Sequence, residues 1–313
     1  MIMIPYATSR DTRIDGMKFV LIFLVILGHI TCYDFGLGID RMMSYFRMPM
    51  FVIISGFLTH QHSSSRVKRS TLKLLALYLI FQTGHLMYDF CLKGIPISLD
   101  RYLNPEIALW YLLCLIYWRG AYHLLKPMGI KPVYAFLISI ALSVLAGFIP
   151  LGHEHLSFQR AFSFLPFFVF GLMLKDKSLV NKINQLNTPL MIGLLLLALV
   201  SAWLLPVFMP RFPYEIWKAP ILRLIQTVVA FVICVGIIRF FPRKMPGVFS
   251  LLGQWTLYYY LYHTLMVRGL NDALLQYHVE LNVFGALLCA ALIVIVITLM
   301  HKVKLFRLLV LEH

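Results

Sequence analysis

Long apolar stretches separated by short polar connections make up most of this chain. A bilayer-spanning helix needs roughly 20 consecutive, mostly apolar residues, and the stretches have about that length. The pattern predicts an all-α membrane bundle of about ten transmembrane helices, folded as one domain over residues 1–313. The predicted spans lie near residues 16–33, 41–60, 71–91, 107–125, 132–150, 158–175, 188–206, 220–239, 248–267 and 281–300.

The composition supports a membrane protein. With 60% hydrophobic and 13% charged residues, the chain has too little polar surface to cover a water-soluble globule of this size. The first apolar stretch runs on into Thr31-Cys32-Tyr33 without a small-residue cleavage site, so we interpret it as a retained helix and not as a secretory signal. The five cysteines lack paired spacing, which argues against a disulfide framework.

The formal net charge of +15 raises nucleic-acid binding as one explanation. In a polytopic chain, however, an excess of Lys and Arg is explained first by orientation, because cytoplasmic connections carry these residues preferentially. We therefore predict both termini in the cytoplasm and no nucleic-acid partner. With the N-terminus inside, the outer connections hold only Arg41, Lys93, Arg101, Arg211, Lys218 and Arg268.

One histidine interrupts the first apolar stretch. A titratable group inside a span is costly unless it faces protein or water, so His29 is a candidate for function. Lys18 precedes it by eleven residues, close to three helical turns, which places both side chains on one face about 16 Å apart. This geometry suits a long donor with an anionic head. Alternatively, Lys18 is an interfacial lysine and His29 bonds to a neighbouring helix.

The run Arg13-Ile14-Asp15-Gly16-Met17-Lys18, followed after ten residues by His29, resembles the first-helix signature of the acyltransferase 3 family of integral membrane O-acyltransferases. The family normally has Arg where Lys18 stands. Further resemblances follow in the family's order, and the one around Arg160 is similar to its sugar O-acetyltransferase branch. They are Arg47 with Met48–Phe57, the basic turn Arg66, Lys68 and Arg69, Leu109–Leu112, Arg160 with Phe164–Gly171, and Leu257–His263.

The resemblance implies a membrane acyltransferase in a bacterial cytoplasmic (inner) membrane. It implies transfer of an acyl group, usually acetyl, from cytoplasmic acetyl-coenzyme A to a hydroxyl of a cell-surface or exported saccharide. His29 is then the central catalytic group, either as general base on the acceptor or as carrier of the acyl group. Lys18 keeps the positive charge of the family's Arg but loses its planar, bidentate fork.

Three further residues are candidates for the catalytic site. Arg47 and Arg160 lie in apolar runs and are candidates to bind the thioester oxyanion or an acidic acceptor; the alternative is pairing with a helix-end carbonyl. His263 lies beside several tyrosines in a late span. It either lines the acceptor channel or satisfies a tyrosine hydroxyl.

The remaining candidates concern binding. Ser55, before Gly56, allows close helix packing or contributes a hydroxyl to the site, and Trp110 either anchors its helix at the interface or stacks on adenine or sugar. The isolated histidine pairs provide too few ligands for zinc, so we predict no metal. The residues predicted to bind the coenzyme, some of which orientation alone would also explain, are Arg13, Lys18, Arg66, Lys68 and Arg69.

The competing function is a transporter or flippase of a polysaccharide precursor. In such a protein the intramembrane His, Arg and Asp residues would form a substrate or proton path. Its sequence mark would be inverted repeats with paired, Gly- or Pro-broken helices. The sequence shows no such symmetry, which favours the acyltransferase.

Overall fold

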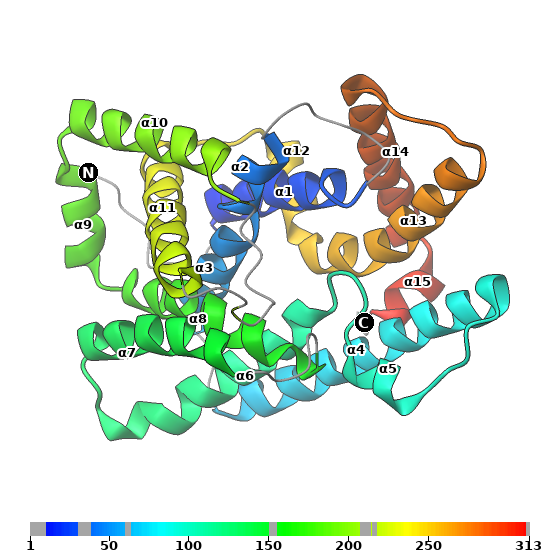
Figure 1. The fold of residues 1–313 in the computed structure, drawn as a ribbon, viewed down its shortest axis with the longest axis horizontal. Coiled ribbons are helices and arrows are strands. Elements are labelled where there is room, and N and C mark those ends of the chain that lie inside the picture. The colour runs from blue at the N-terminus through cyan, green and yellow to red at the C-terminus, as the bar shows by residue number, and fades with distance from the viewer. Residues whose placement is uncertain are drawn as a thin grey trace. The chain divides into compact units, whose positions relative to one another are not determined.

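The computed structural model describes residues 11–30, 39–59, 64–149, 155–206, 214 and 218–310, without the side chains of residues 64–68. In this part of the chain the regular elements are helices, as predicted (Figure 1). The chain forms two compact units, and each is assembled from separate stretches of sequence. Unit 1 comprises residues 1–54, 174–208 and 225–301, and unit 2 comprises residues 55–173, 209–224 and 302–313.

Unit 1 is built around the first helix. Helix α1 (Thr12–Leu27) packs along α12 and against α13, and α2 lies against α10. Most of α11 and the first half of α3 also belong to this unit. The helices that lie wholly or mostly in unit 1 after α1 are α2 (Ile39–Ser44), α3 (Arg47–Thr59), α9 (Lys177–Gln185), α10 (Thr188–Leu204), α11 (Ala219–Phe240), α12 (Gly247–Gln254), α13 (Thr256–Gln276) and α14 (Val283–Lys302).

Unit 2 holds the middle of the chain. Helix α7 packs along α8, and α6 contacts both α4 and α8. Three short 3₁₀ segments, η1 (Lys126–Met128), η2 (Ala146–Phe148) and η3 (His155–Ser157), adjoin these helices. The helices of unit 2 are α4 (Ser64–Lys93), α5 (Leu99–Leu103), α6 (Trp110–Leu125), α7 (Pro132–Leu145), α8 (Phe158–Met173) and α15 (Lys304–Leu309).

The prediction of about ten spans is wrong. Among the described residues, four helical stretches are long and apolar enough to cross a membrane. A fifth is added if α9 and α10, which meet at 91°, act as one broken span. The four stretches are Ile39–Thr59, His155–Met173, Ala219–Phe240 and Val283–Lys302.

Other predicted spans fold into helices that are too short or too polar. Helices α1 and α6 have 16 residues each, which corresponds to about 24 Å at 1.5 Å per residue, against a hydrocarbon core of about 30 Å. Helix α4 is long enough but carries Gln82, His85 and Asp89 within its apolar stretch. Both chain termini lie outside the described residues, so their cytoplasmic location stays a prediction.

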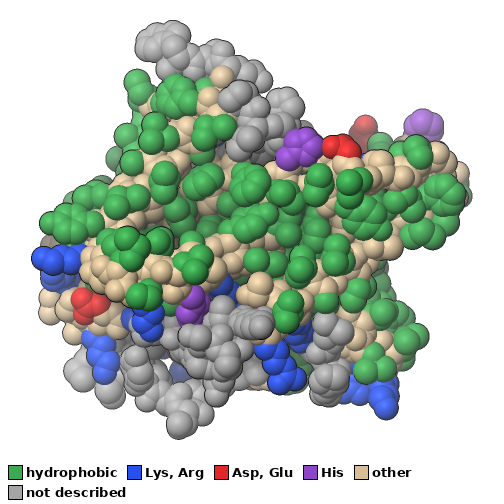
Figure 2. Space-filling model, turned by 90° about the horizontal axis from the view of Figure 1, so that it is seen from below, with side chains coloured by type: hydrophobic (Ala, Val, Ile, Leu, Met, Phe, Trp, Pro, Cys, Tyr) green, Lys and Arg blue, Asp and Glu red, His purple; other side chains and the backbone are tan. Residues whose placement is uncertain are grey.

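Helix α14 has the surface of a lipid-facing helix. Its exposed large apolar side chains recur every three or four residues and therefore share one face, whereas Ala286, Ala290 and Ile297 are fully buried on another. Among the side-chain types coloured in Figure 2, hydrophobic side chains cover the largest area. The exposed large apolar residues on α14 are Phe284, Leu288, Leu292, Ile295, Val296 and Leu299.

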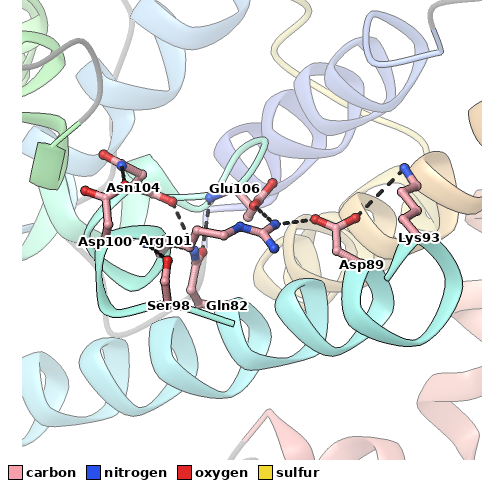
Figure 3. A network of polar contacts seen from close by, with 8 residues as sticks. All are labelled: Gln82, Asp89, Lys93, Ser98, Asp100, Arg101, Asn104 and Glu106. Atoms are coloured by element: carbon pink, nitrogen blue, oxygen red, sulfur yellow. Dashed lines mark hydrogen bonds and ion pairs between the residues drawn. The ribbon is translucent and has the colours of Figure 1, made fainter. Parts of the chain in front are cut away.

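A charge network joins the end of α4 to α5 in unit 2 (Figure 3). The carboxylate of Asp89 is almost completely buried, and it pairs with Arg101 and, at 3.9 Å, with Lys93. Arg101 also binds Glu106 at 2.8 Å. Gln82 donates from Nε2 to the backbone carbonyls of Arg101 and Asn104, at 2.7 and 3.0 Å. The network pairs the buried charge of Asp89, which would lower the stability of the fold if it had no partner. It also holds the segment before α6 in place.

Two helix contacts depend on glycine. A Cβ atom added at Gly253 of α12 would overlap the backbone carbonyl of Asp15 in α1. A Cβ atom added at Gly56 of α3 would overlap the carbonyl of Phe168 in α8. The close-packing interpretation of Ser55-Gly56 is thus supported for the glycine, because small residues let helix backbones approach in membranes.

We expect Gly56→Ala to lower stability by about 1–3 kcal/mol, the usual cost of overpacking, since backbone atoms cannot yield as a flexible side chain can. Gly193→Ala in α10 is the matched control, because a Cβ atom there meets nothing within 4 Å. Thermal unfolding of both variants in the same detergent is the measurement. Equal midpoints would contradict the packing role of Gly56.

Candidate functional site

His29 lies just beyond the end of α1. The helix ends at Leu27, and the next turn tightens, with the His29 amide donating to the carbonyl of Ile26 at 3.1 Å. The side-chain amide of Asn271 in α13 donates to the carbonyl of His29 at 2.9 Å. The backbone of this half-buried histidine is therefore positioned by a turn and by α13, and not by helical periodicity from Lys18.

Arg47 lies against the same turn. A Cβ atom at Gly28 would overlap the Arg47 guanidinium, so the missing side chain of Gly28 makes room for this cation. Nη1 of Arg47 is 3.4 Å from Oδ1 of Asp40, whose side chain is half exposed. The structure thus brings together two predicted catalytic residues, His29 and Arg47, that are distant in sequence.

His263 of α13 completes the cluster in unit 1. Its ring is fully buried, and its centroid is 5.6 Å from that of His29. Nδ1 of His263 is 2.9 Å from the carbonyl oxygen of Tyr259. Because a carbonyl only accepts hydrogen bonds, Nδ1 carries the proton and Nε2 has a free lone pair. Among the described residues, Nε2 is buried and has no hydrogen-bond partner.

These three side chains provide the groups that acyl transfer requires. The half-buried imidazole of His29 can meet a ligand, and a second imidazole beside it has a basic nitrogen in a low-dielectric site. The guanidinium of Arg47 can stabilise negative charge on a carbonyl oxygen. We call His29, Arg47 and His263 the histidine cluster.

Two predicted coenzyme-binding residues of α1 have protein partners. Nη2 of Arg13 donates to the carbonyls of Ile238 and Phe241 at 2.6 and 3.0 Å, which caps the end of α11. The ammonium of Lys18 pairs with Asp15 at 2.7 Å. Arg13 therefore has a structural role, and Lys18 is partly neutralised. Binding of the coenzyme by either residue stays a prediction.

Arg160 and Trp110 meet in unit 2, whereas the histidine cluster belongs to unit 1. The guanidinium carbon of Arg160 is 5.1 Å from the centroid of the Trp110 ring, a cation–π distance. The Trp110 ring also stacks on Phe164 with centroids 5.2 Å apart. Both Arg160 and Trp110 are buried. Trp110 thus contacts protein through its ring, and stacking on a ligand stays a prediction.

The other predicted binding residues also belong to unit 2. The hydroxyl of Ser55 bonds to that of Tyr111 at 2.5 Å. Arg69 is exposed in the second turn of α4. The side chains of Arg66 and Lys68 lie outside the described residues. No group of three or more His, Cys, Asp or Glu side chains among the described residues could hold a metal ion.

The sequence prediction missed Asn271. Asn271 follows His263 by eight residues on α13, slightly more than two turns, so the two lie near one face of the helix. That spacing is visible in the sequence. Its meaning is not, because a polar residue on an apolar helix has many uses, and only the packing of α1 on α13 reveals the contact with His29.

The fold and the cluster define a helical membrane protein with a histidine pair and an arginine. A family model described as an acyltransferase domain matches residues 11–301. The chain therefore belongs to the acyltransferase 3 family, as the motifs predicted, and it is a multi-pass membrane acyltransferase. No curated protein and no solved structure matches the chain.

We expect Gly28→Ala to reduce acyl transfer by about 10²-fold, because displacing a catalytic group by about 1 Å has effects of this size and the added methyl would move the Arg47 guanidinium. Stability should change little, since a flexible side chain can move aside. Gly120→Ala in α6, where a Cβ atom meets nothing within 4 Å, is the matched control. Wild-type rates in Gly28→Ala would exclude this role of Arg47.

Proposed function

We propose that this acyltransferase takes an acetyl group from cytoplasmic acetyl-coenzyme A and transfers it to a hydroxyl of a cell-surface or exported saccharide at a bacterial cytoplasmic membrane. The observation that carries the proposal is the packing of the His29 and His263 rings beside Arg47, with centroids 5.6 Å apart. Membership of the family supports acyl transfer. The motif around Arg160 supports the saccharide acceptor through its resemblance to the sugar O-acetyltransferase branch.

In one route, His29 acts as general base. Its imidazole removes the proton of the acceptor hydroxyl while the oxygen attacks the thioester carbonyl carbon. Arg47 binds the oxyanion of the tetrahedral intermediate. Collapse breaks the carbon–sulfur bond, and the imidazolium returns its proton to the leaving thiolate, so that coenzyme A departs as a thiol.

In the other route, His29 carries the acetyl group. Its nitrogen attacks the thioester, the carbon–sulfur bond breaks, and the thiolate leaves with the imidazole proton. The acceptor hydroxyl then attacks the carbonyl carbon of the acetyl-imidazole and must lose a proton while the nitrogen of His29 is still acylated. The carbon–nitrogen bond breaks, and the proton taken from the hydroxyl is passed to the released imidazole of His29. The free lone pair of His263 Nε2 suits this second step, because its tautomer makes it an acceptor.

Two groups of cations are the proposed contacts of the donor and of the acceptor. Lys18 and the basic turn with Arg66, Lys68 and Arg69 are the proposed contacts of the coenzyme on the cytoplasmic side. Arg160, held over the Trp110 ring, is the proposed acceptor-side cation. Saccharide sites commonly combine an aromatic ring with a few placed polar groups, and the pairing of Arg160 with Trp110 agrees with this.

The direct test follows transfer of labelled acetyl from acetyl-coenzyme A to cell-surface glycan in membranes. We expect His29→Ala to reduce transfer by about 10²–10⁴-fold, the contribution of a positioned base. His278→Asn is the matched control, because His278 is exposed on unit 1 outside the cluster and Asn tolerates its positive φ of 52°. Equal transfer by His29→Ala and wild type would remove His29 from the mechanism. Absence of transfer by wild type, with transport of a saccharide precursor instead, would favour the flippase.

We expect His263→Asn to lower kcat by about 10²-fold with little change in KM for acetyl-coenzyme A. The Asn amide can still donate to the carbonyl of Tyr259 but has no basic nitrogen. Acid quenching without acceptor then separates the two routes. In the carrier route the variant still accumulates labelled protein, whereas the base route gives none. An unchanged kcat would show that His263 has only a structural role.

A further inference from the structure

Arg119 is a cation of α6 that has no role in the proposed mechanism. It interrupts the apolar sequence of this helix, and its side chain crosses to α4, where Nη1 donates to the hydroxyl of Ser70 at 2.7 Å. Its Nε is buried and has no hydrogen-bond partner among the described residues. No described carboxylate lies within 4 Å of its guanidinium, in contrast to Arg101 in the same unit.

A second unsatisfied group lies one turn further along α6. His123 follows Arg119 by four residues, so their side chains share a face. Its Nε2 is buried and has no partner among the described residues. Buried polar atoms in proteins are almost always hydrogen-bonded. Here two unpaired nitrogens lie one turn apart on one helix face, where a ligand or ordered water can bind both.

The surroundings make an anion the suitable ligand. Arg69 is exposed directly before Ser70, in the basic turn that begins α4. A hydroxyl and a guanidinium that point to one place are donors with the geometry that phosphate oxygens accept. The hydrogen bond between Arg119 and Ser70 places the basic start of α4 beside the end of α6, so Arg69 and Arg119 can share one anionic ligand.

We propose that Arg119, Ser70 and His123 form a phosphate-binding site for the coenzyme A part of the acyl donor. The inference rests on the proposed function for the identity of the donor. Arg119 is then a donor-binding residue in addition to the basic turn of α4. The phosphate of a lipid headgroup shares this chemistry, and the experiment separates the two sources.

The test titrates coenzyme A and inorganic pyrophosphate against purified protein in nanodiscs made of neutral lipid. We expect Arg119→Gln to weaken binding of both probes about tenfold, the effect of losing one charge-assisted hydrogen bond. Arg119→Lys keeps the charge and should lose less affinity. Lys131→Gln removes an exposed cation from the connection that follows α6, and we expect its affinities to stay within about twofold of wild type.

Several outcomes would overturn the proposal. Equal affinity of wild type and Arg119→Gln for both probes would exclude the site and leave the proposed function intact. If the wild type binds pyrophosphate but not coenzyme A, the assignment of the donor fails together with the proposed function. If Arg119→Gln changes only the affinity for anionic lipid, measured in nanodiscs with and without phosphatidylglycerol, the ligand is a headgroup. Matching thermal midpoints of Arg119→Gln and Arg119→Lys confirm that both variants fold.

Discussion

The close approach of α1 to α12 and α13 is the constraint on which the histidine cluster depends. Gly253 has no side chain, so the α12 backbone lies directly against the carbonyl of Asp15 near the start of α1. At the other end of α1, Asn271 of α13 binds the carbonyl of His29. With both ends held, the turn after α1 lies beside His263. A displacement of α1 would separate the two imidazoles without changing any residue of the cluster.

A charge in an apolar bundle destabilises the fold unless it has a partner, and the partly buried arginines of this protein differ in their partners. Arg13 bonds to carbonyls at the end of α11, and Arg101 binds two carboxylates. Each of these two cations has two partners in the protein and stabilises the fold. Arg119 has only a serine hydroxyl among the described residues. A cation with so few protein partners lowers stability unless a ligand binds it. The number of its protein partners therefore separates a functional from a structural arginine better than its position in an apolar stretch does.

Three of the residues predicted to be catalytic lie together, whereas too many spans were predicted. His29, Arg47 and His263 were identified from motifs, and the structure brings them together in unit 1. The span count was too high because hydropathy sums apolar residues across turns. The stretch near 248–267 is divided at Trp255 into α12 and the start of α13, and α1 stops at Leu27. Helix ends depend on capping and on tertiary contacts that a hydropathy window does not detect.

What the sequence determined by itself is the class of protein and its chemistry. Its apolar composition requires a lipid environment, and the ordered motifs from Arg13 to His263 place it in the acyltransferase 3 family. Only the tertiary structure decided how individual polar groups are used. The tautomer of His263 is set by the carbonyl of Tyr259, and the charge of Lys18 is shared with Asp15. Hydrogen bonds and ion pairs act over about 3–4 Å, so their partners become known only when the packing of the helices is known.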